Sequence, residues 1–236
     1  MNHFIYYVLP GEDNPELRYS LRSLAANGPE DIKVSFVGSP PLWVDDSKVT
    51  IVEGNPYQDR FQNSLHNLQV ACELEPGDFY TMNDDFFIMK PWPDELPVWF
   101  WQPIETHMKN SMKDPKSNPR KQVFARTLSY LRHKSIEIPM HYELHIPMLI
   151  NGTEMLRILD EASDYINIEN PPIWRTLYGN LSELTTLPHY SRMDVKHHSR
   201  YTIKDELDFL STDENSFHRT RFLLESKFTE PSPWEK

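Results

Sequence analysis

Hydrophobic positions in the first half of the chain fall into short runs that are separated by longer segments of helical periodicity. Four runs have the length and the apolar or aromatic character of buried strands: residues 3–9, 32–37, 48–52 and 78–82. Between the first two, Asn14 suits a helix N-cap and Pro15 a first helical position, which predicts a helix as far as residues 27–28. Residues 58–74 repeat apolar side chains at helical spacing. This alternation predicts an α/β fold with a mostly parallel sheet and flanking crossover helices.

The second half is less periodic. It predicts strands at residues 98–106, 142–146 and 195–202, and helices at residues 123–131, 153–162 and 216–228. No internal repeat, low-complexity tract or linker divides the 236 residues, a length that suits one domain with a sizeable core. We therefore expect residues 1–236 to form a single domain.

The most informative polar residues are Asp84 and Asp85, which lie between two apolar runs, residues 79–82 and 86–89. Acidic residues are poor strand formers, and burying unpaired charge is costly. We therefore expect the pair at the carboxyl end of a strand, in the crevice where open α/β sheets bind ligands. A hard divalent cation that holds a diphosphate would balance this charge. The alternative is a tight Asn-Asp turn with solvated carboxylates.

Three segments, in order along the chain, resemble one family. Residues 79–89 resemble the modified DxD element of nucleotide-sugar transferases with the GT-A fold, and most of all the Tyr-x-Asn-Asp-Asp-Phe-Phe segment of the Stealth family of sugar-1-phosphate transferases. Residues 16–23 (Glu-Leu-Arg-Tyr-Ser-Leu-Arg-Ser) resemble that family's upstream signature. The third match is His145-Ile-Pro followed by Arg175. The chain is also similar to short bacteriophage glycosyltransferases, including some that modify hydroxylated DNA bases.

The resemblance implies a GT-A-like, Rossmann-like domain. Its first part, residues 1–90, would bind the nucleotide sugar, and residues 91–236 would bind the acceptor. A UDP-sugar is the expected donor, with Mn²⁺ or Mg²⁺ as the metal. The residues implied for donor binding are Pro10, Gly11, Glu12, Arg18, Asn83 and Asp84. The residues implied for the metal are Asp85, Asp84 and a late histidine, His197 or His198.

Some of these residues have a simpler explanation. The helix beginning near Asn14 would point free N–H groups at the loop of residues 9–12, which suits an anion, but Arg18 and Arg22 would also serve as surface residues of that helix. The late histidines lack the regular spacing of a zinc site, and a solvated polar strand also explains them.

Two departures from the family bear on the reaction. The family's opening Thr-Trp-Val-Asp-Gly segment is missing, and residues 7–12 read Tyr-Val-Leu-Pro-Gly-Glu instead. The family also carries a catalytic glutamate on the helix before the Asn-Asp-Asp element, and an ungapped comparison places His66 there. For this reason we favour glycosyl transfer over phosphotransfer.

Candidate catalytic residues lie in the second half. Glu143 and His145 alternate on the predicted strand and would share one face, where a carboxylate orients an imidazole that acts as a general base. Either residue can be the base, and a structural histidine beside Pro147 is the alternative. The family resemblance further implies that Arg175 reaches the donor phosphates.

Charge is distributed unevenly along the chain. The formal net charge is −11, yet residues 107–134 contain eight lysines and arginines and a single aspartate, a local charge of +7 that leaves −18 elsewhere. Such a segment can bind phosphates, as in DNA, or it can be a solvated basic loop. There is no GxGxxG or P-loop pattern, the single cysteine (Cys72) falls in a helical apolar pattern, and no signal peptide or long apolar run is present. We therefore expect a cytoplasmic protein, in the host cytoplasm if it is phage-encoded.

These observations predict a metal-dependent glycosyltransferase that moves a sugar from a nucleotide-diphosphate sugar to an acceptor hydroxyl. A hydroxymethylated base in phage DNA is the first candidate acceptor. The same-fold alternative is a Stealth-type sugar-1-phosphate transferase that acts on a glycan. The alternative from another class is a non-catalytic nucleotide-sugar or DNA-binding module.

Overall fold

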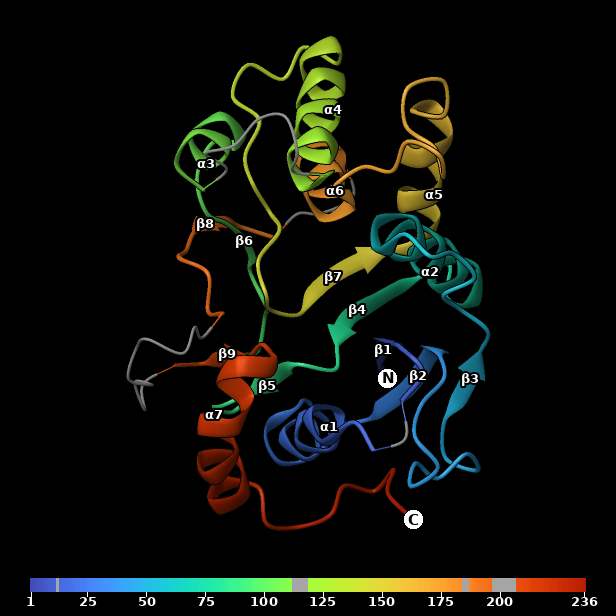
Figure 1. Cartoon of the computed structure of the whole chain (residues 1–236), viewed down its shortest axis with the longest axis vertical. Coiled ribbons are helices and arrows are strands. Elements are labelled where there is room, and N and C mark those ends of the chain that lie inside the picture. The colour runs from blue at the N-terminus through green and yellow to red at the C-terminus, as the bar shows by residue number, and fades with distance from the viewer. Residues whose placement is uncertain (12, 112–118, 184–186, 197–206) are drawn as a thin grey trace.

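A computed structural model describes residues 1–11, 13–111, 119–183, 187–196 and 207–236. Its central sheet has the strand order β3-β2-β1-β4-β7 (Figure 1). The strands are β1 (Asn2–Val8), β2 (Ile32–Gly38), β3 (Thr50–Val52), β4 (Asp78–Asn83) and β7 (Met148–Asn151). The first four are parallel to their neighbours, and β7 is antiparallel to β4. The predicted mostly parallel sheet is confirmed.

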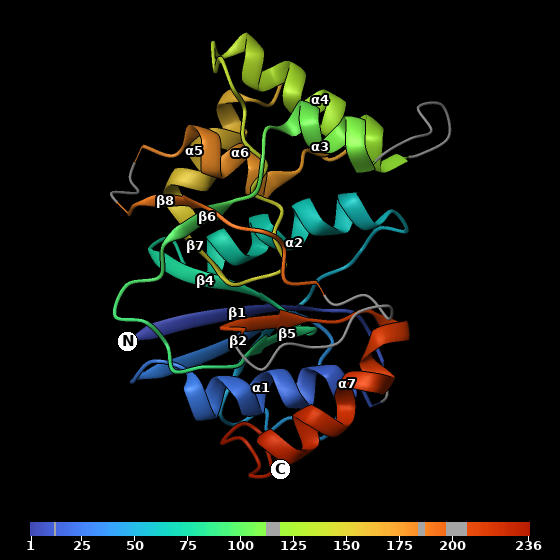
Figure 2. The ribbon, with the colours of Figure 1, turned by 90° about the vertical axis from the view of Figure 1, so that its left-hand side faces the viewer.

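Helices cover both faces of this sheet (Figure 2). One face carries α1 (Pro15–Asn27) and α7 (Glu214–Lys227). The other carries α2 (Arg60–Leu74), α3 (Ile104–Ser111), α4 (Pro119–His133), α5 (Gly152–Glu161) and α6 (Trp174–Leu181). Successive side chains of β1 point to opposite faces of the sheet. Phe4 and Tyr6 pack in the hydrophobic cluster that includes the leucines of α1, whereas Ile5 packs in the cluster that includes the leucines of α2.

The chain reverses its direction of winding at β1. From β1 it crosses through α1 to β2 on one side, and after β3 it returns through α2 to β4 on the other side. The carboxyl ends of β1 and β4 therefore flank a topological switch point, where open α/β sheets bind ligands. Gly38 ends β2 at this edge with φ of 122°, and a Cβ there would lie 1.9 Å from the carbonyl oxygen of Val8. Only glycine fits that close approach without strain.

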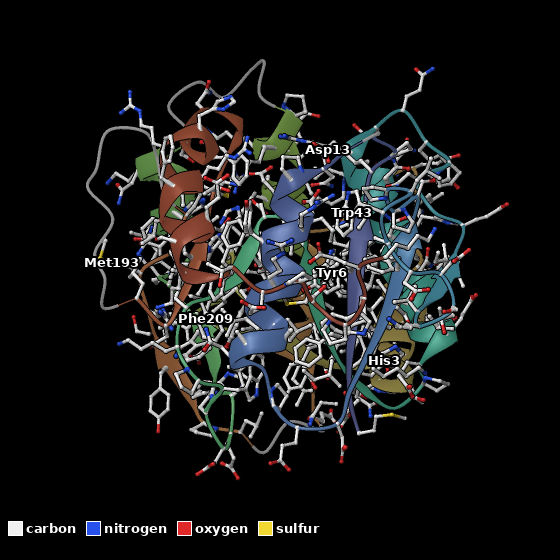
Figure 3. All side chains as sticks on the ribbon, turned by 90° about the horizontal axis from the view of Figure 1, so that it is seen from below. His3, Tyr6, Asp13, Trp43, Met193 and Phe209 are labelled. Atoms are coloured by element: carbon white, nitrogen blue, oxygen red, sulfur yellow. The ribbon has the colours of Figure 1, made fainter. Side chains whose placement is uncertain are left out.

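The start of α1 lies at the same edge. The Asn14 side chain accepts a hydrogen bond from the N–H of Leu17 (3.0 Å), and Pro15 is the first helical residue, as predicted. Beside it, Trp43 donates from Nε1 to the carbonyl of Asp13 (2.6 Å), and both residues lie near the amino end of α1 in Figure 3.

Two strand predictions in the second half are wrong in whole or in part. Residues 98–106 contain only β6 (Val98–Phe100), which pairs with β8 (His189–Ser191), before α3 begins. Residues 142–146 are irregular, because the side chains of Thr176, Arg175 and Asp194 bond backbone groups that a strand would use. The strand predicted at residues 195–202 lies mostly outside the described residues, and of its described part Lys196 forms an isolated bridge to Ser211. A further pair, β5 (Phe86–Ile88) and β9 (Phe209–Ser211), lies on the α1 side.

The three helices predicted in the second half are present as α4, α5 and α7. Cys72 is buried in α2, and burial raises the pKa of its thiol to about 12, as expected for an inert structural cysteine. Across the described ranges, no helix is both long enough and apolar enough to cross a membrane.

Candidate active site

One pocket joins the carboxyl end of β4 to the amino ends of the helices α2, α4 and α6. It has a volume of about 280 Å³. Its lining residues are Arg60, Phe61, Ser64, Asn83, Arg120, Glu143, His145, Pro172, Ile173 and Trp174. Asn83 comes from the predicted donor element, whereas Glu143 and His145 are the two predicted bases. The fold therefore brings together residues that are some sixty positions apart in the sequence.

His145 is oriented by Asp194. Its Nδ1 donates to Oδ2 of Asp194 (2.6 Å), and its backbone N–H donates to Oδ1 of the same carboxylate (2.9 Å). Burial opposes the charge of Asp194, but the hydrogen bonds from His145 and from the N–H of Val195 hold the pKa of this carboxyl at about 2. The carboxylate stays ionised at neutral pH, which fixes the proton on Nδ1 and leaves Nε2 free to accept one. The prediction that Glu143 orients His145 is wrong, since Asp194 takes that place.

Glu143 lines the same pocket, and its Oε2 makes no hydrogen bond to the imidazole of His145. Its Oε2 is buried and has no hydrogen-bond partner within the described part of the chain. A buried carboxylate oxygen without a partner is costly, and such atoms occur where a ligand group completes the bonding. Glu143 is therefore placed to accept a hydroxyl or amide donor from a molecule in the pocket.

Arg175 lies beneath this segment and is almost fully buried, at 3% exposure. Its Nη1 donates to the carbonyls of Leu144 (3.2 Å) and Ile146 (2.7 Å), and its Nη2 donates to Oγ1 of Thr81 (3.1 Å). These bonds fasten the residues on either side of His145 to β4. The described contacts of Arg175 thus position the base, and the contact with donor phosphates stays a prediction.

An acidic group lies between the amino end of α1 and the turn that follows the pocket residue Asn83. Asp84 accepts a hydrogen bond from Nδ2 of Asn14 (2.7 Å), and burial, with the nearby charge of Asp85, raises the pKa of Asp84 to about 6. Glu16 accepts from the hydroxyl of Thr212 (2.6 Å), and burial, with the charges of Asp84 and Asp85, raises its pKa too. Three carboxyl groups from α1 and the β4–β5 turn therefore share a partly desolvated region, and a cation would stabilise their ionised forms.

Asp85 already contacts a cation of the protein. Its Oδ2 accepts from Nζ of Lys196 (2.8 Å) and from Oγ of Ser211 (2.9 Å). Both members of the ion pair are largely shielded, with side-chain exposures of 19% for Lys196 and 15% for Asp85. The pair ties the β4–β5 turn to the segment that follows Asp194.

The donor chemistry of Asp84 and Asp85 fits a divalent metal ion. Carboxylate oxygens are the ligands that Mg²⁺ and Mn²⁺ prefer, and Mg²⁺ is often held by one or two carboxylates together with substrate phosphates. Among the described residues no three metal-binding side chains converge into a preformed cage. The two aspartates could therefore hold a metal jointly with a bound diphosphate rather than alone. His197, the predicted third ligand, and His198 lie outside the described residues.

Of the predicted donor-binding residues, Asn83 lines this pocket, whereas Pro10, Gly11 and Arg18 do not. Pro10 and Gly11 are exposed and follow β1 at the carboxyl edge, and Glu12 lies outside the described residues. Arg18 stacks over Trp43 (4.5 Å to the ring centroid) and lies 3.9 Å from the carboxylate of Glu235, so it does not line the pocket. His66 also lies apart from it, with its ring against that of Tyr57.

The basic segment is partly engaged inside the fold. Arg126 donates to the carbonyl of Pro171, Arg132 pairs with Glu105 and Lys134 pairs with Glu161. Arg120 lines the pocket, and Lys109 is exposed on α3. Lys113 and Lys116 lie outside the described residues. The internal partners reduce the charge that this segment can offer to an external phosphate.

Two residues that matter for this geometry had little signal in the sequence. Asp194 lies 49 residues from His145, and its role depends on tertiary contact alone. Lys196 belongs to a polar run that also fits a solvated strand. Glu16, by contrast, is part of the Glu-Leu-Arg-Tyr-Ser segment, and its position next to a predicted ligand loop could have identified it.

Comparison with known proteins gives partial matches. No family profile matches the chain. The α/β subunits of N-acetylglucosamine-1-phosphotransferase from Mus musculus are 36% identical over 100 residues, which is 36% of this chain and 8% of that protein. The match thus spans less than a tenth of the relative's length.

Two solved glycosyltransferases superpose on the fold at low similarity. The galactosyltransferase LgtC, solved with donor and acceptor sugar analogues, shares 8% identity over 75% of this chain and 69% of its own, with a TM-score of 0.40. The glycosyltransferase GlyE of Streptococcus pneumoniae TIGR4 shares 8% identity over 81% of this chain and 45% of its own, with a TM-score of 0.38.

Proposed function

We propose that this protein is a glycosyltransferase that moves a sugar from a nucleotide-diphosphate sugar to an acceptor hydroxyl. One observation carries the proposal: Asn83, which directly precedes Asp84 and Asp85 at the carboxyl end of β4, lines the same pocket as His145, the partner of Asp194. The turn offers carboxylates for a donor's metal-bound diphosphate, and the pair offers a base for the acceptor. Such an arrangement suits group transfer between two bound molecules.

In the proposed reaction, Nε2 of His145 takes the proton of the acceptor hydroxyl as that oxygen attacks the anomeric carbon. Asp194 holds the ring in the tautomer that can accept this proton and stabilises the imidazolium that forms. Glu143 bonds a hydroxyl of the sugar or the acceptor through its unpartnered Oε2. When bound, a divalent cation at Asp84 and Asp85 supplies Lewis-acid stabilisation of the departing diphosphate.

The donor is expected to lie over the first part of the chain. The N–H groups at the start of α1 and the exposed loop with Pro10 and Gly11 form an edge suited to an anion. Residues 1–90 would thus hold the nucleotide, for which a uridine diphosphate sugar is the first choice, with Mn²⁺ or Mg²⁺. Residues 91–236 would supply the base and the acceptor side.

Sugar-1-phosphate transfer is the second candidate function. The partial identity to the mouse N-acetylglucosamine-1-phosphotransferase favours it, and the same carboxylates and base would serve. In that reaction the acceptor oxygen attacks the β-phosphorus of the donor, and a nucleoside monophosphate leaves. The two functions therefore differ in their released product, which is a nucleoside diphosphate in glycosyl transfer.

The acceptor has less support than the donor. A hydroxymethylated base in DNA rests on the charge of residues 107–134, most of whose described basic residues interact within the protein. A glycan hydroxyl needs no basic surface and is equally compatible with the pocket. A non-catalytic nucleotide-sugar or DNA-binding module would show binding without turnover.

The test is to incubate the purified protein and Mn²⁺ with a panel of UDP- and GDP-sugars and to identify the nucleotide released. We expect consumption of one donor with release of its nucleoside diphosphate, and much slower consumption by His145→Ala when acceptor is present. Release of the monophosphate would replace the first function by the second. Donor binding without release would favour the non-catalytic module, and the absence of both would overturn the proposal.

A further inference from the structure

The ion pair between Lys196 and Asp85 lies where the proposed function requires a metal ion. Lys196 Nζ is 2.8 Å from Asp85 Oδ2, a direct charge-assisted hydrogen bond. The same carboxylate oxygen accepts from Ser211 Oγ at 2.9 Å. Oδ2 of Asp85, one of the two carboxylate oxygens that could bind a metal, is therefore already bonded within the protein.

The surrounding charges explain why a cation is needed there. Glu16 and Asp84 are the nearest carboxyl groups, and each feels the charge of Asp85 and of Lys196. Arg175 also acts on Asp85, but its donors bond Thr81 and the residue 144–146 segment. Lys196 is thus the cationic group that directly contacts this acidic cluster in the described part of the chain. One ammonium group leaves three carboxyl groups incompletely balanced.

On this basis we propose that Lys196 is an internal counter-ion that holds Asp85 in the metal-free protein and releases it to a divalent cation. The inference rests on the proposed metal-dependent function. A divalent cation brings twice the charge of the ammonium group, and it gains further oxygen ligands from the diphosphate of the donor. The lysine, on its flexible stem, can move aside without a change in the backbone. Lys196 would therefore keep the turn ordered between catalytic cycles and lower the affinity for free metal.

The consequence is an inverse relation between the charge at position 196 and the affinity for metal. Lys196→Gln removes the charge but can still donate a hydrogen bond to Asp85, so the turn should keep its shape. This variant should bind Mn²⁺ at least about tenfold more tightly than the wild type, since no ammonium group has to be displaced. Lys196→Met is a second neutral variant, and Lys196→Arg should bind Mn²⁺ like the wild type.

The experiment measures Mn²⁺ binding to the full chain by calorimetry or electron paramagnetic resonance, both without nucleotide and with UDP, whose diphosphate can complete the ligand set. Lys90→Gln is the matched control, because Lys90 forms an exposed pair with Asp208 (3.3 Å) elsewhere. In an Asp85→Asn background, Lys196→Gln should bring no gain. An affinity unchanged within twofold in both neutral variants, or a gain that persists with Asp85→Asn, would overturn the inference.

A separate arm distinguishes this inference from the proposed function. Binding of UDP and GDP to the wild type is measured with saturating Mn²⁺. If neither nucleotide binds, the proposed function fails, whatever the result with Lys196. If a nucleotide binds and the Lys196 variants leave Mn²⁺ affinity unchanged, the inference about Lys196 fails alone.

Discussion

The imidazole Nδ1 of His145 lies 2.6 Å from Oδ2 of Asp194, a carboxylate that also accepts the backbone N–H of His145. One side chain therefore fixes both the ring and the backbone of the candidate base. The two residues belong to irregular segments, which the hydrogen bonds of Arg175 and the isolated bridge between Lys196 and Ser211 hold in place. The base is positioned by side chains rather than by a regular strand.

Removal of this base should reduce turnover strongly. His145→Ala should lower kcat by about 10²–10⁴-fold, the usual contribution of a positioned general base. Asp194→Asn should lower it by about 10–100-fold, because the ring loses the partner that sets its tautomer. Steady-state kinetics with the identified donor checks both values, and His218→Ala, an exposed histidine on α7, is the control. Unchanged turnover in His145→Ala would move the role to Glu143.

Asp84 should make the protein less stable as the pH rises. Its folded-state pKa is raised from 3.8 to about 6, so the folded protein binds this proton more tightly than the unfolded chain does. The stability that this binding contributes is fully present below the unfolded pKa and is lost as the pH rises through about 6. Asp84→Asn should therefore increase the free energy of unfolding at pH 7.5 by about 1–3 kcal/mol, a gain that disappears near pH 4. Urea denaturation at both pH values measures it. A variant less stable than the wild type at pH 7.5 would contradict this account.

Arg175→Lys should act on stability and on the base more than on nucleotide affinity. A lysine retains the charge but cannot reach both carbonyls and the Thr81 hydroxyl. The free energy of unfolding should fall by about 2–4 kcal/mol, since charged hydrogen bonds at a buried site are removed. Denaturation and calorimetry with UDP check the two effects separately. Weakened nucleotide binding in a variant of normal stability would instead support the donor contact that the family resemblance implies.

Much of the sheet could be predicted from the sequence, because strands β1 to β4 and helices α1 and α2 carry strong local signals. The Asn14 cap, the Pro15 start and the apolar runs are visible without any tertiary information. The segment around His145 could not be predicted in this way. Its alternating residues resemble a strand, but Arg175 and Asp194, from distant parts of the chain, bond the backbone that a strand would use. The pairing of His145 with Asp194 depends on those same contacts.

Chelation of divalent metal should abolish transfer. EDTA is expected to remove activity, and added Mn²⁺ should restore it, because the single ammonium group of Lys196 cannot balance both Asp84 and Asp85 and the donor diphosphate. Asp85→Asn should lose at least about 10²-fold in kcat, the scale of losing one positioned charge stabiliser. Asp208→Asn, which alters an exposed ion pair, is the control. Full activity in EDTA would exclude the metal role.

The DNA acceptor can be tested through the salt dependence of binding. If the basic segment neutralises phosphates, replacing one phosphate-binding side chain should reduce the slope of log affinity against log salt by about 0.9. Lys109→Ser, which changes an exposed residue, should then weaken binding to duplex DNA with hydroxymethylated bases and lower this slope. Arg132→Ser should change it little, because Arg132 already pairs with Glu105. Fluorescence anisotropy over a salt series measures both. If the wild type shows no binding at low salt, a glycan or protein hydroxyl becomes the favoured acceptor.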